Sequence, residues 1–293
     1  MADLALLLLT LAWGTTFTFV KDVLEVVSPG LFLAARFGVA AAVLATVWAV
    51  RRDRPTPGLW RHGFLLGLAM LAGFALQTLG LRYTTPARSG FLTGLSVLVV
   101  PFVARFLMGR RVRSASWMGV ALAVAGLATL SFGEGVEAEV RLGDLLTIGC
   151  AVAFALQIVF TSEWSGRHPL VPFVLVQLLV TVAGATAALP FEGAFLSAGG
   201  LPRFVWTVAF TGVVMTAFAF FVMNWGQRHT TAVRAALIFS LEPAAAALFS
   251  HYYGGEPLLP TDWLGGALIV LGVAAGEVGG ALQARAADVG GAG

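Results

Sequence analysis

Two charged side chains, Arg36 and Glu242, fall deep inside long apolar stretches of this sequence. A charge within a membrane is costly, so a function is the first hypothesis for each. Structural alternatives exist. Arg36 can snorkel to the interface or pair with a carbonyl, and Glu242 can hydrogen-bond backbone groups freed by Pro243. Glu242 is the one carboxylate predicted at mid-membrane depth, which favours facilitated diffusion over proton antiport.

Uncharged polar side chains also recur within the apolar stretches. Any one of them alone is typical of a hydrogen bond between helices. As a set they would supply donors and acceptors to a mostly apolar cavity, which suits a small amphipathic metabolite better than a bare ion. The predicted set is Gln77, Thr93, Ser96, Gln157, Gln177 and Ser240.

Trp13 lies near the middle of the first apolar stretch and is followed by Gly14. A central tryptophan needs a partner for its indole N–H, and the glycine removes bulk where another group packs closely. Trp13 is therefore either a helix-packing residue or a wall of a substrate cavity. We predict the cavity wall, and we place Thr16, Phe17 and Phe154 beside it.

The composition places the protein in a bilayer. Apolar residues make up 58% of the chain and charged residues 11%, whereas soluble domains carry about 25% charged residues. The single cysteine, Cys150, excludes an internal disulfide and a cysteine-based metal cluster, and the four histidines lack metal-ligand spacing. We expect no metal, no cofactor and no nucleic-acid partner. A membrane-embedded enzyme is disfavoured because neither a metal set nor an activated nucleophile is evident.

A helix needs about 20 apolar residues to cross the hydrocarbon core of a bilayer. Ten stretches of the sequence approach that length, which predicts an all-α integral membrane protein with ten transmembrane helices. The predicted spans are 4–24, 30–50, 63–82, 87–108, 116–133, 143–163, 170–190, 203–223, 232–252 and 262–282.

An even number of spans places both termini on one side of the membrane. Eleven basic residues fall on that side, namely Arg51, Arg52, Arg54, Arg61, Arg110, Arg111, Arg113, Arg167, Arg228, Arg234 and Arg285. Five fall on the other side, namely Lys21, Arg82, Arg88, Arg141 and Arg203. Because basic residues concentrate in cytoplasmic loops, we predict that both termini are cytoplasmic.

The sequence contains an internal repeat. Residues 67–126 recur in looser form at 213–272, with a shift of 146 positions. The matched positions include Gly80 with Gly226, Arg82 with Arg228, Leu95 with Leu241, Trp117 with Trp263 and Gly126 with Gly272. A duplicated unit in a chain this apolar is typical of transporters built from two related halves around a central cavity.

Each half has five predicted spans, so the second copy must enter the membrane inverted. We divide the chain into a first five-helix repeat (1–136), a second, inverted five-helix repeat (137–284) and a short cytoplasmic tail (285–293). The hairpins after the third and eighth spans are then expected at opposite ends of the bundle, where we predict that they act as gates. The candidate gate residues are Arg82, Tyr83, Arg88, Arg228, His229 and Arg234.

Three stretches, in order along the chain, resemble EamA-type proteins of the drug/metabolite transporter superfamily. They are Trp13-Gly14-Thr15-Thr16-Phe17 with Ala35-Arg36-Phe37, Phe91-Leu92-Thr93-Gly94-Leu95 with Val100-Pro101, and Ser240-Leu241-Glu242-Pro243-Ala244 with Trp263-Leu264-Gly265. The resemblance covers residues 4–282, although Gly109-Arg110-Arg111 departs from the Gly-Glu that many members carry after the fourth span.

The resemblance implies ten helices in two inverted five-helix repeats, with spans one to four and six to nine around a central cavity and spans five and ten outside it. It also implies a multi-pass protein of the bacterial inner membrane that exports small metabolites, above all amino acids. Exporters of the YddG type are the nearest subgroup. We therefore expect export of neutral or aromatic amino acids by rocking of the two halves.

An exchanger of phosphorylated metabolites or nucleotide sugars from the same superfamily is the main alternative. Such a protein should place clustered lysines or arginines on its cavity helices, whereas only Arg36 is deep here. The bilayer and a small molecule are the expected partners. The spacings Gly119-x3-Ala123 and Gly272-x3-Gly276 allow close helix packing, which favours a monomer, with a weak homodimer as the alternative.

Overall fold

The protein is all-helical where its structure is defined. The computed structural model describes residues 1–84, 86–133, 142–254 and 259–290. Within those ranges no strand occurs, and one isolated antiparallel bridge joins Val27 to Leu196. Lipid offers no partner for backbone N–H and C=O groups, so a membrane segment must satisfy them internally, as a helix does. The predicted all-α membrane fold is confirmed.

The helices follow one another with short connections. In the first half they are α1 (Ala2–Gly14), α2 (Thr16–Val23), α3 (Pro29–Arg51), α4 (Leu59–Gly80), α5 (Pro86–Gly94), α6 (Ser96–Phe106) and α7 (Ser114–Gly133). In the second half they are α8 (Leu142–Trp164), η1 (Ser165–Arg167), α9 (Leu170–Glu192), η2 (Ala198–Gly200), α10 (Leu201–Gly212), η3 (Val213–Phe218), α11 (Ala219–Gln227), α12 (Ala232–Phe239), α13 (Glu242–Gly254) and α14 (Pro260–Gly290).

Eight segments in the described ranges are long and apolar enough to cross a bilayer. The first consists of α1 and α2, the fourth of α5 and α6, and the one before α14 of α12 and α13. Two shorter apolar stretches, Ser114–Thr129 in α7 and Pro260–Gly276 in α14, stand where the fifth and tenth spans are expected. The count of ten membrane-crossing helices stays a prediction.

Three of the spans are interrupted near their middle. α1 gives way to α2 at Thr15, α5 to α6 at Leu95, and α12 to α13 at Ser240 and Leu241. The hydroxyls of Thr15 and Ser240 each donate to a main-chain carbonyl one turn back, at 2.7 and 2.6 Å. Pro243 lacks the N–H that would continue α12 into α13. At Thr15, Leu95 and Ser240 the backbone keeps right-handed helical angles, and each N–H bonds a carbonyl three residues back, so the helix tightens locally without unwinding.

The span Ala198–Gln227 carries a different irregularity. Between α10 and α11 the helix widens into η3, which is a π-helix over Val213–Phe218. A π-turn inside an α-helix is rare and is frequently found at functional sites. η3 packs against α3, so its backbone faces another transmembrane helix.

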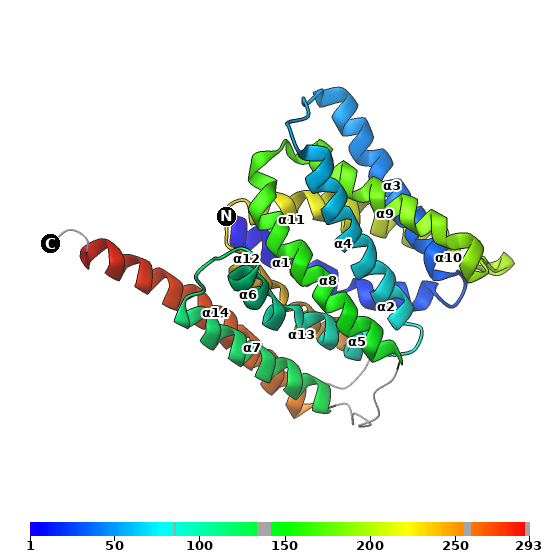
Figure 1. The fold of residues 1–293 in the computed structure, drawn as a ribbon. Coiled ribbons are helices and arrows are strands. Elements are labelled where there is room, and N and C mark those ends of the chain that lie inside the picture. Colours follow the sequence, from blue (N-terminus) through cyan, green and yellow to red (C-terminus); the bar gives the residue numbers. More distant parts are fainter. Residues whose placement is uncertain (85, 134–141, 255–258, 291–293) are drawn as a thin grey trace.

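α7 and α14 lie side by side along one edge of the bundle (Figure 1). A Cβ atom at Gly119 would lie 2.6 Å from the carbonyl oxygen of Gly272, and one at Gly126 would lie 2.5 Å from that of Gly265. Only glycine permits this approach of the two backbones. The small-residue stripes therefore pack helices together within one chain.

The two predicted gate hairpins lie at opposite ends of the bundle (Figure 1). At the end of α2, Lys21 Nζ donates to the carbonyls of Leu81 and, at 3.1 Å, Thr84. At the start of α1, Asp3 forms an ion pair with Arg234 at 3.1 Å. Since α1 and α2 form one span, its two ends hold one hairpin each.

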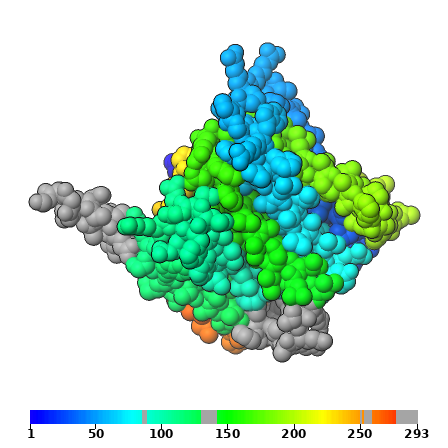
Figure 2. Space-filling model, viewed as in Figure 1, coloured from blue at the N-terminus to red at the C-terminus, as the bar shows by residue number. Residues whose placement is uncertain are grey.

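Side chains fill the gaps that the ribbons leave open (Figure 2). In the same view the connection between α3 and α4, residues 52–58, projects beyond the rest of the bundle. Arg51, Arg52 and Arg54 are exposed there. Such an exposed basic loop is common next to the headgroups of a membrane surface.

Candidate functional site: a central cavity

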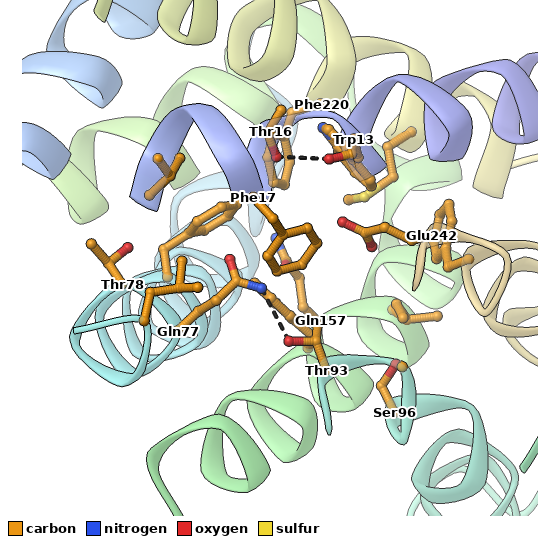
Figure 3. Close-up of a pocket in the computed structure, with 18 of the residues that line it drawn as sticks. Trp13, Thr16, Phe17, Gln77, Thr78, Thr93, Ser96, Gln157, Phe220 and Glu242 are labelled. Carbon is orange, nitrogen blue, oxygen red and sulfur yellow. Dashed lines mark hydrogen bonds between the residues drawn. The ribbon is translucent and has the colours of Figure 1, made fainter. Parts of the chain in front are cut away.

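A cavity of about 70 Å³ lies where the interrupted spans meet, between helices from both halves of the chain (Figure 3). Aromatic rings form much of its wall, and polar groups enter it from several helices. Ten residues singled out from the sequence line it, namely Trp13, Thr16, Phe17, Arg36, Gln77, Thr93, Ser96, Phe154, Gln157 and Glu242.

Trp13 joins the two halves at this cavity. Its indole N–H donates to the carbonyl of Met215 in η3 at 3.1 Å. Its ring packs against Phe220 and Phe239, with centroids 5.7 and 5.8 Å apart. Trp13 is thus both a packing residue and a wall of the cavity, and the N–H has the partner that a central tryptophan requires.

Gly14 permits close contact between α1 and α13. A Cβ atom at Gly14 would lie 2.7 Å from Cβ of Ala245 and 2.8 Å from the carbonyl oxygen of Glu242. The space beside Trp13 is therefore occupied by a neighbouring helix. The contact fixes the first turn of α13, which carries the Glu242 side chain into the cavity.

Arg36 is held inside the protein, with 4% of its surface exposed. Its Nε donates to Thr216 Oγ1 at 2.8 Å, and one terminal nitrogen donates to the carbonyl of Met215 at 3.4 Å. The guanidinium also lies 5.2 Å from the ring centroid of Phe74. Of the two structural alternatives, the structure shows pairing with a carbonyl and not snorkelling. No carboxylate of the described residues lies within ion-pair distance of Arg36.

Glu242 opens α13 and points into the cavity opposite Phe17 (Figure 3). Its carboxylate makes no hydrogen bond or ion pair with any residue that the structure describes. The alternative in which Glu242 satisfies backbone groups beside Pro243 is therefore not seen. Pro243 occupies the first turn of α13, where a helix needs no N–H.

The amides and hydroxyls of the cavity are only partly paired. Gln77 Nε2 donates to Thr93 Oγ1 at 3.1 Å, which links α4 to α5. Gln157 Nε2 is buried and has no hydrogen-bond partner among the described residues. A buried donor of this kind is costly unless something accepts from it. The cavity therefore offers an amide, a carboxylate and a guanidinium to a bound molecule.

Two predicted residues lie outside this lining. Gln177 is buried between α9 and α11, where Nε2 donates to the carbonyl of Phe173 at 3.2 Å and approaches Asn224 Oδ1 at 3.5 Å. Ser240 donates to the carbonyl of Leu237 at the break between α12 and α13. Ser240 thus bonds within its own segment, whereas Gln177 bonds within α9 and reaches α11; neither belongs to the lining of the central cavity.

Much of the aromatic wall was not predicted from the sequence, although the repeat contained the signal. The shift of 146 positions relates four pairs of residues that both line the cavity. The pairs are Phe74 with Phe220, Gln77 with Met223, Thr93 with Phe239, and Ser96 with Glu242. Applying the shift to Gln77 and Thr93 would have found two further lining positions, Met223 and Phe239.

The hairpin at one end is tied to both halves. Thr84 is buried, and its Oγ1 donates to Asp144 Oδ1 of α8 at 3.3 Å. The candidate gate residues Arg82 and Tyr83 are exposed beside it. The side chain of Arg88, a third candidate, lies outside the described residues. This hairpin therefore bridges α2, α4 and α8 at that end of the cavity.

The opposite hairpin makes a different set of contacts. Arg228 donates to the carbonyl of His168, which lies between η1 and α9. His229 Nδ1 lies 2.8 Å from the carbonyl of Trp225, and Arg234 pairs with Asp3. These contacts tie the hairpin to the start of α1 and to the connection between α8 and α9.

A histidine pair completes this end. His168 Nε2 lies 2.8 Å from His62 Nδ1, and His168 Nδ1 lies 2.6 Å from Thr56 Oγ1. The ring of His62 stacks on Trp164 with a centroid separation of 4.4 Å. Burial lowers the pKa of His168, and the charges of His62, Arg167 and Arg228 lower it further. Across the described residues, no group of three His, Cys, Asp or Glu is placed to hold a metal ion.

Comparison with known proteins agrees with this architecture. A transporter of Archaeoglobus fulgidus, itself uncharacterised, is 31% identical over 93% of this chain and 84% of its own. The inner membrane transporter YedA of Escherichia coli, also uncharacterised, is 25% identical over 92% of this chain and 88% of its own. A solved crystal structure superimposes with a TM-score of 0.78, covering 94% of this chain and 98% of that one at 21% identity, which supports the fold.

The family model described as "EamA-like transporter family" matches residues 1–132 and 141–275, which together are most of the chain. The interrupted spans, the interior charges and the cavity between the halves are thus features of a membrane transporter. The chain belongs to the EamA-like transporter family.

Proposed function

We propose that this protein exports neutral or aromatic amino acids across the bacterial inner membrane, with both termini cytoplasmic. The observation that supports the proposal is the set of chemical groups that line one small cavity. It holds an interior guanidinium on Arg36, an unpaired carboxylate on Glu242 and an aromatic wall. An amino acid presents the complementary groups, which are a carboxylate, an ammonium and a side chain.

The assignment of groups follows from charge. The α-carboxylate would accept hydrogen bonds from Arg36, because guanidinium–carboxylate bonds are among the strongest in proteins. The α-ammonium would donate to Glu242, and an apolar or aromatic side chain would pack on Phe17, Phe74 and Phe220. The two protein charges and the two substrate charges cancel, so the loaded cavity carries no net charge through the membrane.

The same content argues against a phosphorylated metabolite or a nucleotide sugar. A phosphate needs several cationic donors, and among the described residues that line the cavity Arg36 is the only lysine or arginine. Two of the donors of Arg36 are already engaged by Thr216 and Met215. A membrane-embedded enzyme would need a nucleophile beside a base, and the described residues of this lining do not supply such a pair.

Transport would proceed by alternating access between the two halves. At 70 Å³ the cavity has room for roughly five water molecules, which is too little for an amino acid. The halves must therefore separate to admit a substrate. The breaks at Thr15, Leu95 and Ser240 supply points at which spans can bend, and the hairpins at the two ends supply contacts that can open in turn.

The test is uptake of labelled amino acids into proteoliposomes, with no imposed ion gradient. Saturable uptake of phenylalanine or leucine, competed by unlabelled substrate and absent from empty liposomes, is expected. No amino-acid uptake under either sign of proton gradient would refute the amino-acid proposal. Exchange of a nucleotide sugar or sugar phosphate by the same preparation would establish the alternative substrate class.

A further inference from the structure

A second cavity, of about 700 Å³, lies away from the central one, at the end of the bundle that holds the start of α1. Its walls come from the end of α6, the connection to α7, the last turn of α8 and the start of α12. Ser116 of α7 and Gly276 of α14 complete it. The cavity therefore lies at helix ends, on the seam between the main bundle and the α7–α14 pair.

The lining of this cavity is strongly basic. Four arginines contribute to it, namely Arg110, Arg111, Arg113 and Arg234, against one acidic residue, Glu163. Glu163 already pairs with Arg110 at 2.6 Å and with Arg167. Arg111 forms no hydrogen bond or ion pair with a described residue. Arg234 in turn pairs with Asp3 at 3.1 Å. Four arginines against the two carboxylates of Glu163 and Asp3 leave an excess of two positive charges, which attracts an anion.

Two buried hydroxyl groups of the lining also lack a hydrogen-bond partner among the described residues. They are Ser162 Oγ and Thr230 Oγ1. A buried polar group without a partner is costly. Phosphate oxygens accept hydrogen bonds from hydroxyl and guanidinium donors alike, so one phosphate would satisfy both kinds of group.

The remaining wall is apolar. Met108, Val112, Val159 and Val233 line the cavity beside the arginines. A free inorganic anion would leave this surface without a matching partner. An amphiphile, with a phosphate at one end and a hydrocarbon chain at the other, matches both parts. Basic pockets between helix ends at the membrane surface are known to hold anionic lipid headgroups.

We propose that this cavity binds one anionic phospholipid, whose headgroup phosphate lies among Arg111, Arg113 and Arg234 and whose acyl chain lies along the apolar wall. Ser162 and Thr230 donate to the phosphate. The lipid fills the seam between the α7–α14 pair and the bundle. This site is separate from the central cavity and does not depend on which substrate the protein carries.

Native mass spectrometry of the purified full chain tests the site, with phosphatidylglycerol and phosphatidylcholine as probes. The wild type is expected to bind one phosphatidylglycerol in preference to phosphatidylcholine. The variant Arg111→Gln/Arg113→Gln is expected to bind phosphatidylglycerol about tenfold more weakly. Arg52→Gln/Arg54→Gln, which removes two basic residues outside the cavity, is the matched control and should bind like the wild type.

A second variant, Ser162→Ala/Thr230→Ala, keeps every charge and so separates hydrogen bonding from general attraction. It should lower phosphatidylglycerol binding while the elution volume in gel filtration stays that of the wild type. Equal binding of the two lipids, or equal losses in the arginine variant and its control, would overturn the site. Competition by inorganic phosphate or glycerol 3-phosphate as strong as that by the lipid would overturn the lipid as occupant and assign the cavity to a soluble phosphate.

Discussion

Phe74 and Phe220 occupy equivalent positions in the two copies of the repeated stretch, and their rings pack against each other with centroids 5.8 Å apart. Residues related by a duplication touch each other only where the two copies meet. The contact therefore marks the boundary between the halves, and it lies in the wall of the central cavity. Any motion that separates the halves must change it.

Phe74→Leu and Phe220→Leu should have similar effects, because each removes half of this contact. Both should widen the cavity and shift transport towards bulkier amino acids, at a stability cost of about 1–2 kcal/mol. Competition by a series of amino acids of increasing size against labelled phenylalanine measures the shift. Phe102→Leu, at a position that is 44% exposed, is the control. A shift of the same size in the control would remove the cavity as its cause.

Trp13 should be needed for transport rather than for insertion. Trp13→Phe keeps a ring against Phe220 and Phe239 but loses the hydrogen bond to Met215, which is worth about 1 kcal/mol. Trp13→Ala loses the packing as well, at about 3–5 kcal/mol. We expect transport to fall in both variants, more so in Trp13→Ala, with Trp13→Phe eluting as the wild type does in gel filtration.

The measurement is the initial rate of uptake in proteoliposomes at equal reconstituted protein. Wild-type rates from Trp13→Ala for every substrate tried would mean that Trp13 serves packing alone. A loss of rate together with aggregation of Trp13→Phe would instead assign the residue to stability. The phenylalanine variant is therefore the informative one.

Most of the predicted residues that line the central cavity share one property, which is that they stand out in an apolar background. A charge such as Arg36 or an amide such as Gln157 within a membrane span must face protein, so its position alone indicates the interior. Trp13 stands out for the same reason, because its N–H demands a partner. Eight such residues line one cavity, together with Phe17 and Phe154, which were predicted as neighbours of Trp13.

Phenylalanine carries no such signal. Phe74 lines the cavity and Phe102 is exposed on the outside, yet lipid contact and cavity contact suit the same side chain equally well. Only the repeat distinguishes them, since it aligns Phe74 with Phe220. Polar residues can cause the opposite error, in which a residue is assigned to the cavity although it lies elsewhere. Gln177 and Ser240 are as conspicuous as Gln157, but each donates a hydrogen bond to a backbone carbonyl one turn back and lies outside the cavity lining.

The helix breaks were predictable only in part. Pro243 indicates the break between α12 and α13, because proline cannot supply the N–H of a continuing helix. The breaks at Thr15 and Leu95 have no proline at the break itself and lie within stretches that read as uninterrupted helix. The positions of these two breaks therefore depend on tertiary packing around the cavity.

Glu242→Gln should weaken the binding of amino acids while sparing molecules that lack an ammonium group. A hydrogen bond to a charged group is worth about 1.5–3 kcal/mol, so the KM for phenylalanine should rise about tenfold or more. Inhibition by 3-phenylpropionate, which has the ring and the carboxylate but no ammonium, should be unchanged. Glu25→Gln, at an exposed carboxylate near the end of α2, is the control.

The same variant tests coupling to protons. If Glu242 also carries a proton across the membrane, Glu242→Gln should abolish any dependence of uptake on an imposed pH gradient. An unchanged rate, KM and pH profile would dismiss both roles of Glu242. Loss of 3-phenylpropionate inhibition together with loss of amino-acid binding would mean that the substitution disturbs the whole cavity.

Acid should loosen the histidine contact that joins the α3–α4 connection to the start of α9. Burial holds the pKa of His168 below its ordinary value of 6.5, with His62, Arg167 and Arg228 acting in the same direction. A lowered pKa means that the folded state favours the neutral ring. Its stabilising contribution is complete above pH 6.5 and is lost as the pH falls through the lowered value.

Hydrogen exchange at pH 7.5 and pH 5.5, corrected for intrinsic rates, measures the effect. Residues 56–62 and 165–170 should exchange faster at the lower pH in the wild type. His168→Gln should remove most of that difference, because glutamine cannot take up the proton, whereas His229→Gln should retain it. If His168→Gln kept the full difference, another group would carry the pH response. The neutral ring of His168 would then contribute nothing to the stability of the contact with Thr56 and His62.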